Sequence, residues 1–343
     1  MRGRMAMKKT MKRLLAALIA VLTLTAVLSM SSFAATQKTV KKYKVYTVLG
    51  DSVAAGYSHP GYDINHDYNK IEWNLVPGTY PAIVGKATKA KVHQLAHSGY
   101  RSTDLRALLC NDYNGDGMSP LRLPSVNNDA RHLNVDQLNV LRAAFQQDIR
   151  DSDLITVNIG INDSTQPLMI TMETLQADLG ILGSQMLALL DPFNFVKNTL
   201  LNLEKLAVDA QFYAALAQAE LNSFRMFSEN FDAIIARIHE LNPKAKVVVV
   251  GLYNASENDT IPSGGIGIPI GDIFGSIYAN MNQYMQSGSP YASMGYYTFV
   301  DTWGISSHMN DPESPIYRAD NHPTLKGHQQ IADRIFAVLP AKK

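Results

Sequence analysis

Five short apolar segments, separated by helical and loop-rich stretches, constrain the fold of this 343-residue chain more than any other feature. They comprise residues 44–50, 90–96, 153–159, 245–252 and 296–301. Strands that are apolar on both faces and alternate with helices form a parallel sheet covered on both sides. The sequence therefore predicts an α/β domain, a three-layer α/β/α sandwich around a mostly parallel five-stranded sheet.

The stretches between these segments predict the covering layers. Apolar residues recur at helical spacing in residues 129–150, 224–241 and 325–339, and the second of these stretches ends just before a proline. Residues 51–85 are rich in Gly, Pro, Asn and Tyr, which predicts a short helix followed by a long irregular loop. Residues 254–275 are also predicted as loop.

One insertion follows the third apolar segment. Residues 165–222 are rich in Leu, Ala and Met and are far longer than a crossover between two strands requires. They predict either an extra helical pair packed on the domain or a mobile apolar lid beside the sheet edge.

The amino-terminal segment has the pattern of an export signal. Residues 1–13 are basic, residues 14–30 are apolar and uncharged, and Ser32 and Ala34 offer small side chains for cleavage. We therefore expect a signal peptide over residues 1–34, a mature domain over residues 36–343 and an extracytoplasmic location. An uncleaved membrane anchor at the same segment is the alternative.

The formal net charge of +1 averages two unlike parts of the chain. Six of the 31 Lys and Arg residues lie in the first 34 residues, which hold no acid, so the remainder carries 25 basic against 30 acidic residues. This mildly acidic, 46% hydrophobic chain is neither a disordered protein nor one whose main partner is nucleic acid. The single cysteine, Cys110, excludes an internal disulfide and predicts a buried thiol.

Chemically useful residues follow four of the apolar segments. Ser52 and Gly99 come just after the first and second segments, Asn162 follows the third, and His322 lies between the fifth and the last helix. In an open parallel sheet, ligands bind outside the carboxyl ends of the strands. All four residues are therefore expected at one edge of the sheet.

Their chemistry is complementary. A serine hydroxyl becomes a good nucleophile when a base removes its proton, and histidine suits that role at neutral pH. Attack on an ester builds negative charge on the carbonyl oxygen, which needs fixed donors. The backbone N–H groups of Ser52 and Gly99 and the side-chain amide of Asn162 could supply such an oxyanion hole.

This pattern resembles the SGNH (GDSL) hydrolase superfamily, whose four letters correspond here to Ser52, Gly99, Asn162 and His322. The resemblance covers most of residues 44–340, with the four blocks in order. It implies a flavodoxin-like fold and a serine esterase or lipase that needs no cofactor and no metal. The Gly-x-Ser-x-Gly elbow of α/β-hydrolases is absent, since Ala54 replaces its second glycine.

The acid partner of His322 departs from the family pattern. The family has an acid three residues before its histidine, where this chain has Ala319, whereas Asp320 lies two residues before His322. Asp320 is the expected orienting residue, and a backbone carbonyl in a Ser–His dyad is the alternative.

The sequence is compatible with three functions. The first is a secreted serine ester hydrolase acting on a small-molecule or lipid ester. The second is a carbohydrate O-deacetylase, since the tyrosines of the first loop, such as Tyr57, Tyr62 and Tyr80, could stack on sugar rings or simply pack. The third is a non-catalytic cell-surface binding protein with this fold.

One motif points weakly to a metal. Asp112, Asn114 and Asp116, followed by Gly117, match the first half of a calcium loop, but Leu123 occupies the position of the bidentate Glu. A plain turn is the preferred interpretation, and a structural Ca²⁺ is the alternative.

Overall fold

The computed structural model describes the chain in several stretches. They are residues 40–62, 74–113, 135–167, 210–255, 257, 260–263, 266–305 and 322–342. The chain divides into two compact units, residues 41–340 and a small unit of residues 1–40 and 341–343. In the small unit, Val40 and Ala341 form an isolated antiparallel bridge. The larger unit contains the α/β fold.

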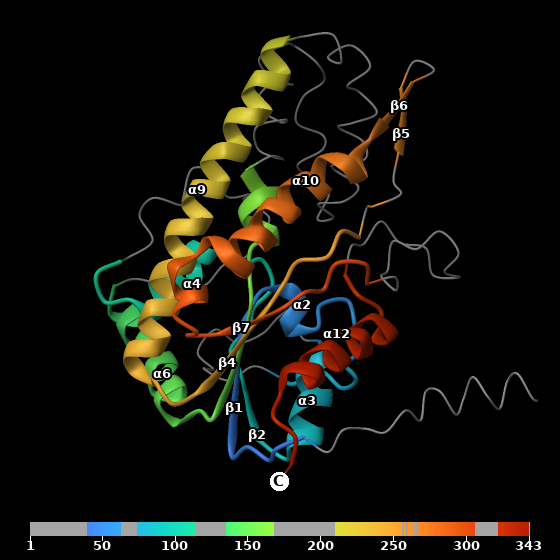
Figure 1. Ribbon diagram of the computed structural model, residues 1–343. Helices are drawn as coiled ribbons and strands as arrows, with labels where there is room; N and C mark the ends of the chain where they lie inside the picture. The colour runs from blue at the N-terminus through green and yellow to red at the C-terminus, as the bar shows by residue number, and fades with distance from the viewer. Residues whose placement is uncertain are drawn as a thin grey trace, which may run out of the picture. The chain divides into compact units, whose positions relative to one another are not determined.

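Five parallel strands form the sheet of this unit (Figure 1). They are β1 (Val45–Gly50), β2 (Lys91–Gln94), β3 (Leu154–Asn158), β4 (Lys246–Val250) and β7 (Thr298–Val300). Their order is β2-β1-β3-β4-β7, which is the flavodoxin-like order. The predicted fold class is confirmed, and each predicted apolar segment contains one strand.

The registers align the carboxyl ends of the central strands. Gly50, the last residue of β1, is opposite Asn158, the last residue of β3, and Val250 of β4 is opposite Val300 of β7. The chain runs to β2 on one side of β1 and to β3 on the other. Loops leaving β1 and β3 therefore diverge at this edge, which is where open α/β sheets bind their ligands.

Two groups of helices flank the sheet in Figure 1. On one side α3 (Tyr80–Thr88) packs against α12 (Leu325–Val338), and on the other α4 (Ser102–Leu109), α6 (Val135–Asp151) and α9 (Ala210–Leu241) pack together. The core strands are almost entirely buried, with β3 inaccessible along its whole length. Burial of these Val, Leu and Ile side chains is the main source of stability.

The remaining elements are shorter or lie beyond the sheet. They are α2 (Ser52–Ala55), the antiparallel hairpin β5 (Thr260–Ser263) and β6 (Ile266–Pro269), α10 (Ile270–Gln283), the π-helical turn η3 (Tyr284–Gly288) and α11 (Pro290–Ser293). Residues 161–167 are also helical.

Several helix and loop predictions need correction. Residues 80–85, predicted as loop, form the start of α3, and residues 254–275 contain the β5–β6 hairpin and the start of α10. The helix predicted over residues 129–150 is present as α6, and α9 ends at Leu241 as predicted. The predicted insertion, residues 165–222, lies mostly outside the described residues, except that its last residues belong to α9 and its first to the helix of residues 161–167.

Candidate active site

Ser52 lies two residues beyond the end of β1, in a turn that admits only glycine at Gly50. A Cβ atom on Gly50 would lie 2.4 Å from the carbonyl oxygen of Asn158, so the two strands close together at this point. Asp51 then caps α2, because its Oδ1 accepts a hydrogen bond from the Val53 N–H at 3.0 Å. This arrangement starts α2 at Ser52 and places the residue at the carboxyl edge.

His322 meets Ser52 from the far end of the chain. The His322 Nε2 atom lies 2.8 Å from the Ser52 Oγ atom, across 270 residues of sequence. Both side chains are buried, with exposed fractions of 7% and 8%. The ring of Tyr57 packs against the His322 ring, with centroids 4.8 Å apart. The structure therefore brings together the predicted nucleophile and its predicted base.

The turn that follows β2 carries Gly99. Its φ of 83° lies in the left-handed region, which glycine adopts at little cost. The turn is joined to β1, because the His97 N–H donates to the Gly50 carbonyl at 3.1 Å, and it is closed by the Tyr100 N–H on the His97 carbonyl. Gly99 therefore lies on a fixed loop beside the Ser52 segment.

Four hydrogen bonds join this turn and the start of α4 to the segment after β3. Asn162 Nδ2 donates to the Tyr100 carbonyl at 3.0 Å, and Gln166 Nε2 donates to the Gly99 carbonyl at 3.2 Å. The buried Asp163 accepts from the Ser102 N–H at 2.9 Å and from the Ser102 hydroxyl. Gly99 and Asn162 are thus held in one rigid group.

The same residues retain donors for a ligand. An amide side chain has two N–H bonds, and Tyr100 engages only one of those of Asn162. Within the part of the chain that the structure describes, the backbone N–H groups of Ser52 and Gly99 donate to no acceptor. These three donors could bind an oxygen that gains negative charge.

Buried groups around Ser52 have shifted acidities. Burial raises the pKa of Asp51 to about 7; the Val53 N–H opposes this rise, and the charge of Asp163 adds to it. Burial lowers the pKa of His328 to about 3, and nearby His59 and His322 lower it further. Shifted pKa values of this kind gather at functional sites.

Sequence reasoning missed several residues of this edge and left one outside the described part. Asp163 and Gln166 support the Gly99 turn. Tyr57, predicted only as a possible sugar contact, packs on the His322 ring, and His59 bonds the Pro323 carbonyl. Proximity to the motifs was the available signal for Asp163 and Tyr57. Asp320 lies outside the described residues, as do residues 1–34.

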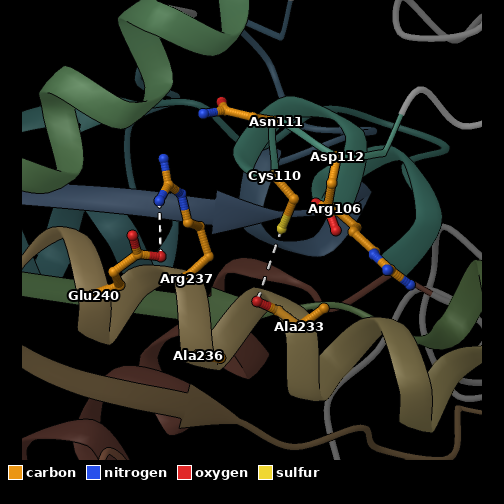
Figure 2. Close-up of a pocket in the computed structure, with 8 residues that line it drawn as sticks. All are labelled: Arg106, Cys110, Asn111, Asp112, Ala233, Ala236, Arg237 and Glu240. Carbon is orange, nitrogen blue, oxygen red and sulfur yellow. Dashed lines mark hydrogen bonds and ion pairs between the residues drawn. The ribbon is translucent and has the colours of Figure 1, made fainter.

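A pocket of about 380 Å³ lies between α4 and α9 (Figure 2). Cys110 is buried in it as predicted, with its Sγ 3.8 Å from the Ala233 carbonyl. Arg237 lines it too, paired with Glu240 at 2.7 Å. Figure 2 shows the Cys110 and Arg237 side chains extending toward α9 and Glu240.

The described residues show neither a metal-ligand cluster nor a membrane-spanning helix. The described ranges contain no group of three or more His, Cys, Asp or Glu side chains placed to hold a metal ion. Asp112 is described, whereas the rest of the calcium-loop motif, residues 114–117, is not. Over the same ranges, no helix combines the length and apolarity of a membrane span.

Comparison with known proteins gives one family and a set of similar folds. The model of the GDSL-like Lipase/Acylhydrolase family matches residues 48–330. No curated protein matches the chain.

Three solved structures illustrate the similar folds. An extracellular lipase from Streptomyces rimosus is 16% identical with a TM-score of 0.49, over 86% of this chain and 99% of that one. A phospholipase A1 from Streptomyces albidoflavus is 16% identical with a TM-score of 0.44 over the same shares. A catalytic mutant of an acetylxylan esterase from Geobacillus stearothermophilus is 15% identical with a TM-score of 0.38, over 87% and 95%.

Proposed function

The chain belongs to the GDSL-like lipase/acylhydrolase family, and from this premise we propose that it is an exported serine ester hydrolase that forms an acyl-enzyme on Ser52. The observation that carries the proposal is the 2.8 Å contact between Ser52 Oγ and His322 Nε2. A nucleophile and a base within hydrogen-bonding reach, at the ligand-binding edge of a parallel sheet, support covalent catalysis.

Acylation is the first half of the reaction. His322 Nε2 accepts the Ser52 proton as Oγ bonds to the ester carbonyl carbon, and the carbonyl oxygen becomes negatively charged. The N–H groups of Ser52 and Gly99 and the second N–H of Asn162 Nδ2 stabilise this oxyanion. When the carbon–oxygen ester bond breaks, the His322 imidazolium donates its proton to the departing alcohol.

Deacylation repeats these steps with water. His322 Nε2 removes a proton from water as the water oxygen attacks the acyl carbon. The second tetrahedral intermediate occupies the same oxyanion hole. Its collapse returns the proton from His322 to Ser52 Oγ and releases the carboxylic acid. The cycle needs no cofactor.

Asp320 completes the proposed machinery. An acceptor on His322 Nδ1–H would fix the tautomer that leaves Nε2 free to accept a proton. Asp320 is two residues before His322 and is the proposed acceptor. A backbone carbonyl is the competing one, and Asp320→Asn separates them, because it should lower kcat by roughly 10⁴-fold only if Asp320 fills the role.

The proposed substrate is a small-molecule or lipid ester. A carbohydrate O-acetyl ester is the second candidate, favoured by two partly exposed rings: Tyr57, which packs on His322, and Tyr62, which packs on Tyr57. Tyr80, by contrast, is fully buried and packs in the core, so it cannot stack on a sugar. Export through a signal peptide over residues 1–34 completes the proposal, with the basic and apolar pattern as its support.

A panel of esters from acetyl to long acyl chains, with acetylated polysaccharide, tests the function. Wild-type enzyme should hydrolyse at least one of them, and Ser52→Ala should lower kcat by roughly 10⁴-fold or more, because the nucleophile is lost. A fluorophosphonate probe should add one covalent mass to wild type, mapped to Ser52 by peptide analysis.

Ser152→Ala is a matched control. Ser152 is also buried, and it bonds Thr47 and the Asp148 carbonyl near the amino end of β3, away from the carboxyl edge that holds Ser52. Its loss should lower stability and leave probe labelling intact. Unchanged ester cleavage by a pure Ser52→Ala preparation would contradict the enzymatic proposal and favour a binding protein.

A further inference from the structure

We propose that His59 is a positioning residue for His322, which it holds in place through the carbonyl group of Pro323. The proposal rests on the function proposed above, in which His322 is the base. His59 lies outside the motifs that identify the family, on the loop that leaves α2. Its role follows from the contacts that this loop makes with the other end of the chain.

The central contact is a buried hydrogen bond. His59 Nε2 lies 2.8 Å from the Pro323 carbonyl oxygen, across 264 residues of sequence. A carbonyl oxygen only accepts, so the hydrogen is on Nε2 and the ring donates. The His59 ring has an exposed fraction of 6%, so this bond is shielded from water.

Pro323 transmits this restraint to the base. It directly follows His322, its ring fixes its own φ, and it restricts His322 to extended backbone. Few torsions therefore separate the bonded carbonyl from the His322 Cα atom. Holding that carbonyl limits where the His322 ring can go.

The loop that carries His59 is bent in a way that few sequences adopt. Ser58, just before His59, has a φ of 68°, in the left-handed region that side chains other than glycine rarely enter. The Tyr57 N–H donates to the Ser52 carbonyl at 3.0 Å, and the His59 N–H donates to the Gly56 carbonyl at 3.3 Å. Strain of this kind gathers at functional sites, where surrounding contacts maintain it.

Together these contacts close a short ring through the active site. The chain runs from Ser52 along α2 to His59, across the hydrogen bond to Pro323, back one residue to His322, and across 2.8 Å to Ser52 Oγ. Tyr57, from the same loop, packs its ring on the His322 ring. One loop therefore links the position of the nucleophile to that of the base.

A second histidine fixes the His59 ring from its other side. The rings of His59 and His328 meet edge to face with centroids 5.0 Å apart. His328 has an exposed fraction of 1%, and its Nδ1 accepts from the Tyr80 N–H at 3.3 Å. The His328 ring packs against the His59 ring and so limits its rotation away from the Pro323 carbonyl.

Two His59 variants separate positioning from packing. His59→Gln keeps an N–H donor near the position of Nε2, whereas His59→Phe fills the space without a donor. His59→Phe should lower kcat by about 10- to 100-fold with KM within about twofold, because it displaces the base and leaves the substrate contacts in place. His59→Gln should recover most of that loss. The rate of Ser52 labelling by the fluorophosphonate probe should follow kcat.

His93→Phe is the matched control. His93 has an exposed fraction of 8% and bonds Asp148 of α6 at 2.6 Å; it lies on β2 opposite Thr47, three residues before the end of β1. It should lower the melting temperature about as much as His59→Phe does and leave kcat and the labelling rate unchanged.

Three outcomes would overturn the proposal or its premise. Wild-type kcat and labelling in His59→Phe would overturn the positioning role. Equal losses in His59→Phe and His59→Gln, or losses that follow melting temperature as in His93→Phe, would reduce His59 to a packing residue. A wild-type enzyme that neither hydrolyses esters nor labels at Ser52 would contradict the proposed function, and the positioning role would fall with it.

Discussion

The catalytic edge and the carboxyl end of α4 both bury polar groups, and they differ in how these groups are paired, although Arg106 Nε in the last turn of α4 also has no partner in the described part of the chain. At the end of α4, side chains satisfy helix carbonyls: Arg142 Nε donates to Ala107 at 2.9 Å, and Gln146 Nε2 and Arg237 Nε donate to Leu109 at 2.8 and 3.2 Å. At the catalytic edge, buried atoms stay unpaired within the described part of the chain. These atoms are Asp51 Oδ2, Gln166 Oε1 and His328 Nε2.

This difference in pairing indicates that buried polar groups at the α4 end serve stability, whereas those at the catalytic edge serve function. A buried polar atom without a partner lowers stability by about 1 to 3 kcal/mol, so folded proteins keep few of them. The three at the catalytic edge are the kind of local conflict that persists where a site must act on a ligand. Changes at the α4 end should therefore alter stability alone, whereas changes at the catalytic edge should alter turnover or its dependence on pH.

Apart from loss of Ser52, His322 or Asp320, the largest effect on turnover is expected at Asn162. Asn162→Ala removes one oxyanion donor and should lower kcat by about 10²- to 10³-fold. KM should change little, because the donor acts mainly on the charged transition state. Steady-state kinetics on the best ester of the panel measures both.

The Asn162 side chain also bonds Tyr100, so loss of that bond needs its own control. Gln166→Leu removes the neighbouring bond to the Gly99 carbonyl and leaves all three proposed oxyanion donors in place. It should reduce kcat far less than Asn162→Ala. Equal reductions would mean that rigidity of the turn, rather than the Asn162 donor, is what matters.

His328 should give the catalytic edge a dependence of stability on acid. Its pKa is near 6.5 when unfolded and about 3 when folded, so unfolding takes up a proton between these values. Its contribution to the free energy of unfolding is present above pH 6.5 and falls by about 1.4 kcal/mol per pH unit below it. At pH 5 this amounts to about 2 kcal/mol.

His328→Asn tests this acid sensitivity. Asn keeps an acceptor for the Tyr80 N–H, so the variant should be modestly less stable at pH 8 from lost packing. Urea unfolding at pH 8 and pH 5 should show a smaller loss of stability on acidification than wild type. If both proteins lose the same stability between these pH values, His328 does not carry the effect.

Gln146 tests the other side of the comparison. Gln146→Leu removes the bonds to the Leu109 carbonyl and to Asn111 Oδ1, and should lower the free energy of unfolding by about 1 to 2 kcal/mol. Turnover should stay at the wild-type value. Gln147→Leu is the control, because the neighbouring Gln147 makes only an exposed bond to Asp151 and should change stability by less than about 0.5 kcal/mol. A loss of kcat in Gln146→Leu would contradict the expectation that changes at the α4 end alter stability alone.

The sequence predicted what depends on local pattern and missed what depends on distant contacts. Runs such as residues 245–252 are apolar on both faces, so the strands and their shared edge follow directly. Helix α4 is a short element whose carboxyl-end carbonyls accept from side chains of α6 and α9, which no local signal reveals. The Gly264-Gly265 pair was an available sign of the β5–β6 hairpin.

The site divides in the same way. Ser52 and His322 could be assigned from the sequence, because the motifs that carry them occur in order and follow segments that are recognisable as strands. The bond from His59 to Pro323 joins residues that are 264 positions apart, and nothing near His59 in the sequence indicates it.

The smallest effect on turnover is expected at Cys110, in the pocket between α4 and α9. Burial raises the pKa of its thiol to about 11, even though Arg106, Arg237 and Arg142 oppose the rise. A thiol is reactive as the thiolate, so at pH 8 native Cys110 should react with a disulfide reagent at least about 10²-fold more slowly than in urea. Cys110→Ala should leave kcat unchanged, because the thiol makes no contact with the Ser52 segment. Fast native labelling, or lost turnover in Cys110→Ala, would show that the α4 end is functional after all and would remove the distinction between the two regions.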